Sequence, residues 1–152
     1  MNSIKLKDYG CIINEIDAIG IITPGMVLEL TSANKVQAHS VASGDVMPYV
    51  ALEDELQGND IDDDYAVADR VQVWIPGRGD EAQLILAVGQ TIVIGDLLVS
   101  NGDGTVKLYV PLDITDVYGT VTDKVYGHQI IGQAIEAVTT TSATARIQSR
   151  IM

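Results

Sequence analysis

Arg78-Gly79-Asp80 is the stretch whose residue types most directly suggest a chemical role, because this triplet is the adhesion signal that integrins bind. The runs "VQVWI" before it and "AQLIL" after it alternate with a period of two, which is typical of strands. Between them, Pro76 presets its own φ, and the two loop glycines can adopt positive φ. The pattern predicts a hairpin over residues 71–86 with Pro-Gly-Arg-Gly-Asp as its loop. We therefore interpret the triplet as a turn and not as a ligand.

The side chains that usually carry catalysis or bind metals are scarce. The only histidines are His39 and His128 and the only cysteine is Cys11, too few and too scattered for a zinc site. Neither a G-x-S-x-G nucleophile motif nor a phosphate-binding G-x-x-x-x-G-K-[ST] motif is present. The sequence predicts a protein that is not an enzyme and has no cofactor or metal.

One acidic stretch, "EDELQGNDIDDDY", resembles the start of a calcium-binding loop. Asp60, Asp62 and Asp64 have the spacing of the first ligands. However, Tyr65 stands where the loop needs glycine, and Val71 stands where a bidentate Glu is needed. We interpret the stretch as a solvated acidic loop, with weak cation binding as the alternative.

Composition and charge exclude several classes of protein. The 152 residues include nine Lys and Arg against 21 Asp and Glu, a net charge of −12, which disfavours binding to phosphate backbones. Hydrophobic residues make up 47%, but no run approaches the roughly 20 apolar residues that span a bilayer. No secretory signal is visible at the start, and the lone Cys11 fits a reducing compartment. We expect a protein of a cytoplasm that binds neither nucleic acid nor membrane.

Short segments with alternating apolar residues recur along the chain and predict an all-β fold. They are separated by Gly, Pro, Asn or Asp, and only "ALEDELQG" could form a short helix. We expect a single compact β-barrel-like or β-sandwich-like domain over residues 1–152, with residues 1–10 as a possible N-terminal arm. The segments are "SIKLK", "GCIINEI", "GMVLEL", "NKVQAHSV", "MPYVALE", "QTIVIGDLLVS", "TVKLYV", "GTVTDKV", "QIIGQAIEAV" and "TARIQSRIM".

An internal similarity suggests that the chain contains a duplication. The segment "ITPGMVLELTSANKVQA" resembles "IVIGDLLVSNGDGTVKL", with Gly25 matching Gly95 70 positions later, and "VALE" resembles "QAIE". The match is short, so chance is the alternative explanation. A true duplication predicts two related β units that pack about a shared core.

The middle of the chain, residues 49–109, resembles the capsid decoration proteins of tailed bacteriophages, also called cement proteins. Their pattern includes an "ALED" segment, a "Y-A-x-G-D-x-V" step, a "P-x-x-G-D-E" hairpin, a glycine before a polar-apolar run, and "G-D-x-L-x-S-x-G-D-G". The sequence departs from it at Ala68, where the pattern has Gly, so an unusual backbone angle there is in doubt. The matching positions are Ala51–Asp54, Tyr65–Val71, Pro76–Glu81, Gly89 and Gly95–Gly104.

This resemblance implies a homotrimer on the outer surface of the virion capsid that stabilises contacts between major capsid proteins. The candidates for interface residues are Trp74 and Tyr9, with Arg78 and Asp80 in the expected hairpin loop. Two alternatives remain open: a glycan-binding or receptor-binding module of the virion, which the scarcity of aromatic residues disfavours, and a trimeric β-fold nucleotide hydrolase. The C-terminal "TTTSATARIQSRIM" lacks the glycine-rich aromatic tail of such hydrolases, as in dUTP pyrophosphatases.

Overall fold

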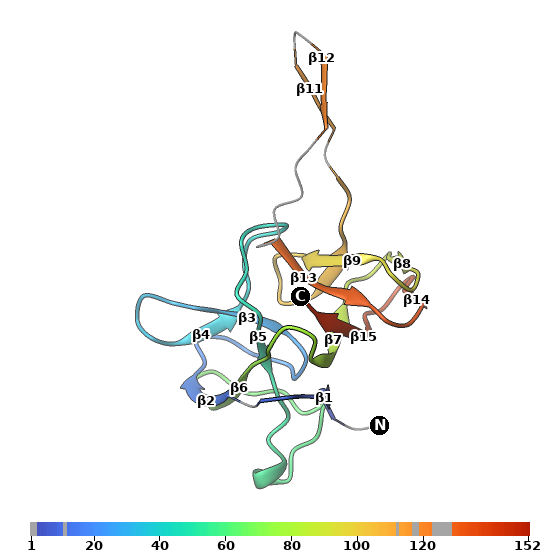
Figure 1. Ribbon diagram of the computed structural model, residues 1–152. Helices are drawn as coiled ribbons and strands as arrows, with labels where there is room; N and C mark the ends of the chain where they lie inside the picture. Colours follow the sequence, from blue (N-terminus) through green and yellow to red (C-terminus); the bar gives the residue numbers. More distant parts are fainter. Residues whose placement is uncertain (1–2, 11, 112, 117–118, 123–128) are drawn as a thin grey trace.

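The protein is all-β, as the sequence predicts. The computed structural model describes residues 3–10, 12–111, 113–116, 119–122 and 129–152 (Figure 1). Within these ranges the chain forms short strands and a 3₁₀ turn, η1 (Glu55–Gln57), which lies in the "ALEDELQG" segment. No helix in the described part of the chain has the length and apolar character needed to cross a membrane.

The first barrel is built from strands of the N-terminal half of the chain. Its five strands are antiparallel neighbours in the order β2-β6-β5-β3-β4. A parallel bridge between Ala18, directly after β2, and Val36 joins the two outer strands and closes the barrel. The strand bounds are β2 (Ile12–Asp17), β3 (Val27–Leu30), β4 (Val36–Ala38), β5 (Tyr49–Ala51) and β6 (Arg70–Ile75).

The second barrel repeats this arrangement with strands from the C-terminal half. Its order is β7-β10-β9-β13-β15, and pairing of β15 with β7 completes the circle. Here too the first strand and the third strand of the unit meet in parallel, at Leu86 and Val106. The strand bounds are β7 (Glu81–Leu86), β9 (Leu97–Ser100), β10 (Val106–Leu108), β13 (Ile130–Ala134) and β15 (Ala145–Ile151).

The registers of the two barrels coincide, which supports the duplication. Leu28 of β3 pairs with Ala38 of β4, and the residues 70 positions later, Leu98 and Leu108, pair in the same way. The closing bridges also fall at corresponding positions of the two barrels. A chance similarity in sequence would not reproduce the strand order and the register together. The two related β units expected from the repeat are therefore present.

The remaining described strands are not part of either five-stranded barrel. Strand β1 (Lys5–Lys7) adds to the outer edge of β7, and β8 (Thr91–Ile92) pairs with β14 (Val138–Thr139). The hairpin of β11 (Asp113–Asp116) and β12 (Gly119–Thr122) lies apart from both barrels in Figure 1. Ile4, just before β1, is fully buried, so this part of the expected N-terminal arm packs against its own chain.

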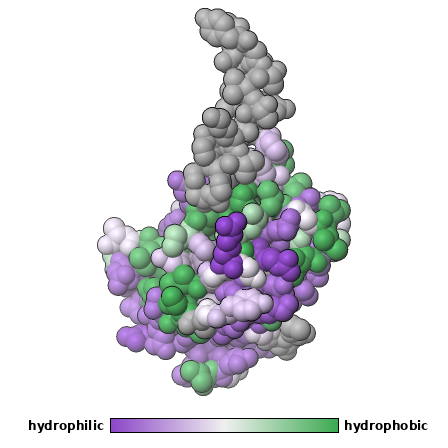
Figure 2. Space-filling view, viewed as in Figure 1, coloured by the Kyte–Doolittle hydropathy of each residue, from purple (hydrophilic) through white to green (hydrophobic). Residues whose placement is uncertain are grey.

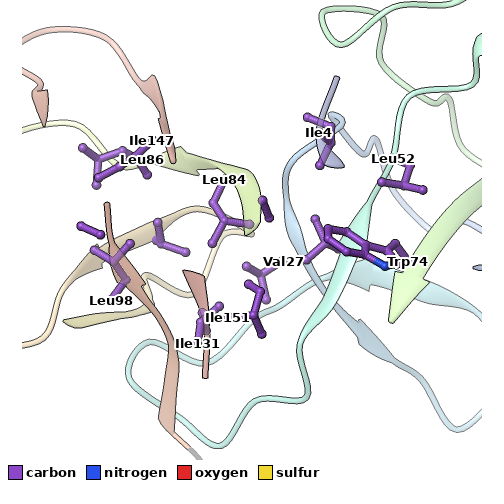
Figure 3. Packing of buried hydrophobic residues seen from close by; sticks show 14 of the residues in the cluster. Ile4, Val27, Leu52, Trp74, Leu84, Leu86, Leu98, Ile131, Ile147 and Ile151 are labelled. Atoms are coloured by element: carbon purple, nitrogen blue, oxygen red, sulfur yellow. The ribbon is translucent and has the colours of Figure 1, made fainter. Parts of the chain in front are cut away.

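One hydrophobic cluster fills the second barrel and continues into the contact with the first. Trp74 and Val27 of the first barrel pack in the same cluster as Leu98 and Ile151 of the second (Figure 3). A smaller cluster fills the first barrel. Because the larger cluster draws side chains from both barrels, neither barrel completes its apolar packing alone. The smaller cluster comprises Ala18, Ile22, Leu28, Val36, Ala51, Tyr65, Val71 and Val73.

The predicted hairpin over residues 71–86 is wrong. β6 pairs with β2 and β5 in the first barrel, whereas β7 pairs with β1, β10 and β15 in the second. The segment Pro76–Asp80 is therefore the linker along which the chain leaves one barrel and enters the next. Alternation shows that both runs are strands, but not which strands they pair with.

Candidate functional site

The linker is organised by the carboxylate of Asp80, which is 1% exposed. One carboxylate oxygen, Oδ2, accepts a hydrogen bond from the backbone N–H of Gly77 at 2.7 Å. The other, Oδ1, accepts the backbone N–H of Tyr9 at 3.1 Å. A short side chain that accepts backbone N–H groups in this way fixes the conformation of a loop. Asp80 thus holds both the linker and the segment after β1.

The linker is also tied to the last strand. The N–H of Gly79 donates to the carbonyl of Ile151, and the N–H of Ile151 donates to the carbonyl of Asp80, both at 2.8 Å. Gly79 has a φ of 97°, a conformation that glycine adopts without strain, whereas Gly77 does not adopt a positive φ. Because the Asp80 carboxylate is buried and bound internally, the triplet cannot present it to an integrin. The interpretation as a structural turn is supported, although the turn joins two barrels.

The structure separates the four residues predicted as interface candidates into two groups. Tyr9 is 86% exposed, and Arg78 is exposed on the same linker that Tyr9 contacts through Asp80. Trp74 is fully buried, because its ring fills the contact between the barrels, and Asp80 is buried by its structural role. The prediction of Trp74 and Asp80 as interface residues is therefore corrected, because neither side chain is accessible on the surface of this chain. Tyr9 and Arg78 remain as candidates and lie at one corner of the molecule.

This corner carries several cations in an otherwise acidic protein. Arg150 lies 2.9 Å and Lys7 3.5 Å from the carboxylate of Glu81, and both cations are more than half exposed. The hydrogen bond from Arg150 and the charges of Arg150 and Lys7 hold the pKa of Glu81 below its usual range, against a smaller opposing effect of desolvation. Together with Arg78, these side chains form what we call the linker corner: Lys7, Tyr9, Arg78 and Arg150.

Several polar side chains that join the two barrels were not singled out from the sequence. Arg146 of β15 donates from Nη1 to the carbonyl of Pro24 at 2.8 Å, and from Nη2 to the carbonyl of Ile61. His39 shares a 2.7 Å hydrogen bond between Nδ1 and the hydroxyl of Ser100. Comparing the two repeats could have indicated Arg146, because Arg70 occupies the corresponding position.

The protonation of the His39 ring follows from its partners. Its Nε2 lies 3.0 Å from the carbonyl oxygen of Asp45, which can only accept a hydrogen bond. Nε2 therefore carries the proton, and in the neutral ring Nδ1 accepts from Ser100. His39 is 3% exposed and holds the barrels together. Its role is structural in this arrangement.

The acidic stretch forms a loop whose carboxylates bind within the protein. Asp60 accepts the N–H of Asp62 at 2.8 Å, and the hydroxyl of Thr23 donates to Asp64 at 2.6 Å. Within the described residues, no group of three or more His, Cys, Asp or Glu side chains could hold a metal ion. Cys11 and His128 lie outside the described residues.

Large apolar side chains are exposed at several places on the surface. Figure 2 shows them in several patches among polar side chains. Large apolar groups in water are typical of interaction surfaces when they cluster. The most exposed are Tyr9, Ile21, Leu56, Val67, Ile94 and Val110.

The fold is similar to that of a phage protein of known structure. The sequence matches no protein-family model and no curated protein. Among solved structures, the chain is similar to the N base of the head fiber gp8.5 of bacteriophage phi29, with a TM-score of 0.56 and 13% sequence identity. The match covers 94% of this chain and 95% of that chain, so it includes both barrels. At this identity the likeness concerns the fold.

Proposed function

We propose that this protein is a structural component of a phage head that binds the outer surface of the shell as a homotrimer and stabilises contacts between major capsid proteins. The observation that carries the proposal is the likeness of fold, over nearly the whole of both chains, to the base of a phage head fiber. The resemblance of residues 49–109 to capsid decoration proteins supports the same role independently. The proposed location is the virion, after assembly in the bacterial cytoplasm.

The proposed activity is binding without chemistry. A protein that binds the assembled shell, and not its separated subunits, stabilises the assembly by mass action. A trimer that contacts several capsid subunits at once gains further from the high effective concentration of its linked contacts. No cofactor, nucleic acid or membrane is part of this proposal, and the net charge of −12 is consistent with a position away from packaged DNA.

The linker corner is the proposed contact with the capsid. Tyr9 offers an exposed aromatic ring, and Arg78 offers an exposed side chain on the linker that the Tyr9 backbone contacts through Asp80. Aromatic and arginine side chains contribute most strongly at protein interfaces. The rigid hydrogen bonding around Asp80 reduces the entropy lost when this corner binds.

The test uses shells of the major capsid protein of the same virus, prepared without this protein. The purified protein should co-sediment with expanded shells and raise the temperature at which they break, measured by light scattering. The variant Arg78→Glu should bind more weakly, whereas Lys35→Glu, which reverses a charge in the first barrel away from the linker, should bind as the parent does. Shells that neither bind the protein nor gain resistance to heat would contradict the proposal.

A further inference from the structure

The contact between the two barrels of one chain leaves a matching pair of surfaces exposed at opposite sides of the molecule. We propose that these surfaces bind each other between copies, so that the second barrel of one copy docks on the first barrel of the next. This inference deepens the proposed function by giving the interface of the homotrimer, and it rests on that proposal only for the number of copies.

The contact between the two barrels of one chain shows which groups each surface would contribute. The first barrel contributes the turn before β3, where the carbonyl of Gly25 accepts the N–H of Ile85 at 3.2 Å. The carbonyl of Pro24 in the same turn accepts Nη1 of Arg146 at 2.8 Å. The second barrel thus contributes the outer edge of β7 and an arginine of β15.

The repeat places the turn and the arginine of this contact on two free surfaces. Strands β3 and β9 correspond with a shift of 70 positions, so the turn of the second barrel that matches Pro24-Gly25 is Ile94-Gly95. Asp17 pairs with Arg70 as Ile85 pairs with Arg146, and Arg70 is thus the counterpart of Arg146. We call Val93–Gly95 the turn surface, and Glu15, Asp17 and Arg70 the edge surface.

The turn surface has the same backbone conformation as the Pro24-Gly25 turn, but it is open to solvent. Gly25 has a φ of 92° and Gly95 a φ of 98°, so the two turns share a backbone conformation. A Cβ on Gly25 would approach Arg146 Nη1 to 2.8 Å, whereas a Cβ on Gly95 would have no heavy atom within 4 Å. Val93 and Ile94 are 55% and 70% exposed. Two adjacent aliphatic side chains in water beside an open glycine are an apolar surface that a partner would bury.

The edge surface presents unpaired backbone groups outward. Gln72 of β6 accepts from the N–H of Leu52 through its carbonyl, so its polar backbone atoms point toward β5 and away from β2. Opposite it, Glu15 must then point its own N–H and C=O away from β6, and Asp17, two residues on, does the same. At the end of β2 the parallel bridge between Ala18 and Val36 closes the barrel and takes the carbonyl of Asp17 as the acceptor for the N–H of Val36, so the groups left open in the described strands are those of Glu15 and the N–H of Asp17. An open edge of this kind is a template for another chain.

Arg70 is available for the contact. Its side chain is 72% exposed and lies 3.5 Å from Glu15 and 3.7 Å from Asp17. Its counterpart Arg146 keeps a carboxylate partner, Asp62 at 3.3 Å, while it donates to the carbonyl of Pro24. Arg70 can therefore keep its acidic neighbours and donate to the carbonyl of Ile94 from a second copy.

Docking of the turn surface of one copy on the edge surface of another is more favourable than pairing either surface with itself. Pairing two β2 edges would place the carboxylates of Glu15 and Asp17 opposite like charges, which is destabilising. The turn surface carries no such charge at Val93 and Ile94. Because β2 and β8, which precedes the turn surface, lie at opposite sides of the molecule (Figure 1), the contact runs head to tail, and a closed ring of three copies follows only from the proposed homotrimer.

The test is the mass of the protein in solution, measured by sedimentation equilibrium at micromolar concentration. The parent protein should have three times the mass of one chain. Ile94→Asp, which damages only the turn surface, and Arg70→Glu, which damages only the edge surface, should each shift the mass to that of one chain. The control Leu56→Asp changes an 88% exposed residue outside both surfaces and should leave the trimer intact. Circular dichroism should show the parent's strand signal for all variants.

Mixing the two damaged variants tests the head-to-tail arrangement directly. An intact turn of Arg70→Glu can dock on the intact edge of Ile94→Asp, so the mixture should give particles of twice the single-chain mass and none of three times. A parent protein that stays a single chain, or folded variants that both remain trimeric, would overturn the inference. Shell binding by the parent, measured separately, would then still stand as support for the proposed function.

Discussion

Tyr65 is a buried titratable side chain that makes the stability of the protein depend on alkaline pH. Burial is the main cause that raises its pKa to about 12, and its hydroxyl donates to the carbonyl of Leu52 at 2.7 Å. The folded state therefore favours the neutral phenol, whereas the unfolded chain releases this proton near pH 10. We expect the free energy of unfolding to fall as the pH rises from about 10 to about 12. Urea titrations should show this loss in the parent and a smaller one in Tyr65→Phe.

Ala68 adopts an unusual backbone angle. The sequence left this angle in doubt, because the decoration-protein pattern has Gly at this position. Its φ is 73°, and its N–H donates to the carbonyl of Ala18 at 2.9 Å. A Cβ in this conformation costs about 1 kcal/mol. Ala68→Gly should therefore raise the free energy of unfolding by up to about 1 kcal/mol in denaturant titrations. The same change at Ala66, which does not have a positive φ, should lower it or leave it unchanged.

At the scale of elements, the linker between the barrels depends on one carboxylate. Replacing Asp80 with Ala leaves the N–H groups of Gly77 and Tyr9 without their acceptor, and each lost charged hydrogen bond costs more than a neutral one. We expect Asp80→Ala to lower the free energy of unfolding by about 2–3 kcal/mol in urea titrations. Arg78→Ala, at an exposed position two residues earlier, should change it by less than about 0.5 kcal/mol. Equal effects of the two changes would contradict the assigned role.

The same elements show what the sequence can and cannot predict. Alternating apolar residues identified β6 and β7 as strands, because a side-chain period of two follows from strand geometry alone. The pairing of β6 with β2, far away in sequence, depends on competition among many strands, which local pattern does not record. The internal repeat carried more information, since similar sequences fold into similar units. The burial of Trp74 became clear only from the contact between barrels.

At the scale of the whole molecule, the shared core couples the two barrels into one cooperative unit. Trp74 is the only tryptophan and is fully buried where side chains of both barrels meet. Its fluorescence reports the contact between barrels, while far-UV circular dichroism reports the strands of both. We expect the two signals to change in a single coincident transition during denaturation by urea. Separate transitions would show that each barrel is stable alone and would contradict the coupling.

The cost of disrupting this shared core gives a second measure of the coupling. Val27 and Ile151 come from different barrels and pack in the same cluster as Trp74, so a cavity there weakens the contact as well as the core. Trp74→Ala should lower the free energy of unfolding by about 3–5 kcal/mol. Val71→Ala, confined to the smaller cluster of the first barrel, removes less apolar volume and should leave the circular dichroism transition single. If Trp74→Ala instead splits the transition in two, the contact around this ring is what joins the barrels into one cooperative unit.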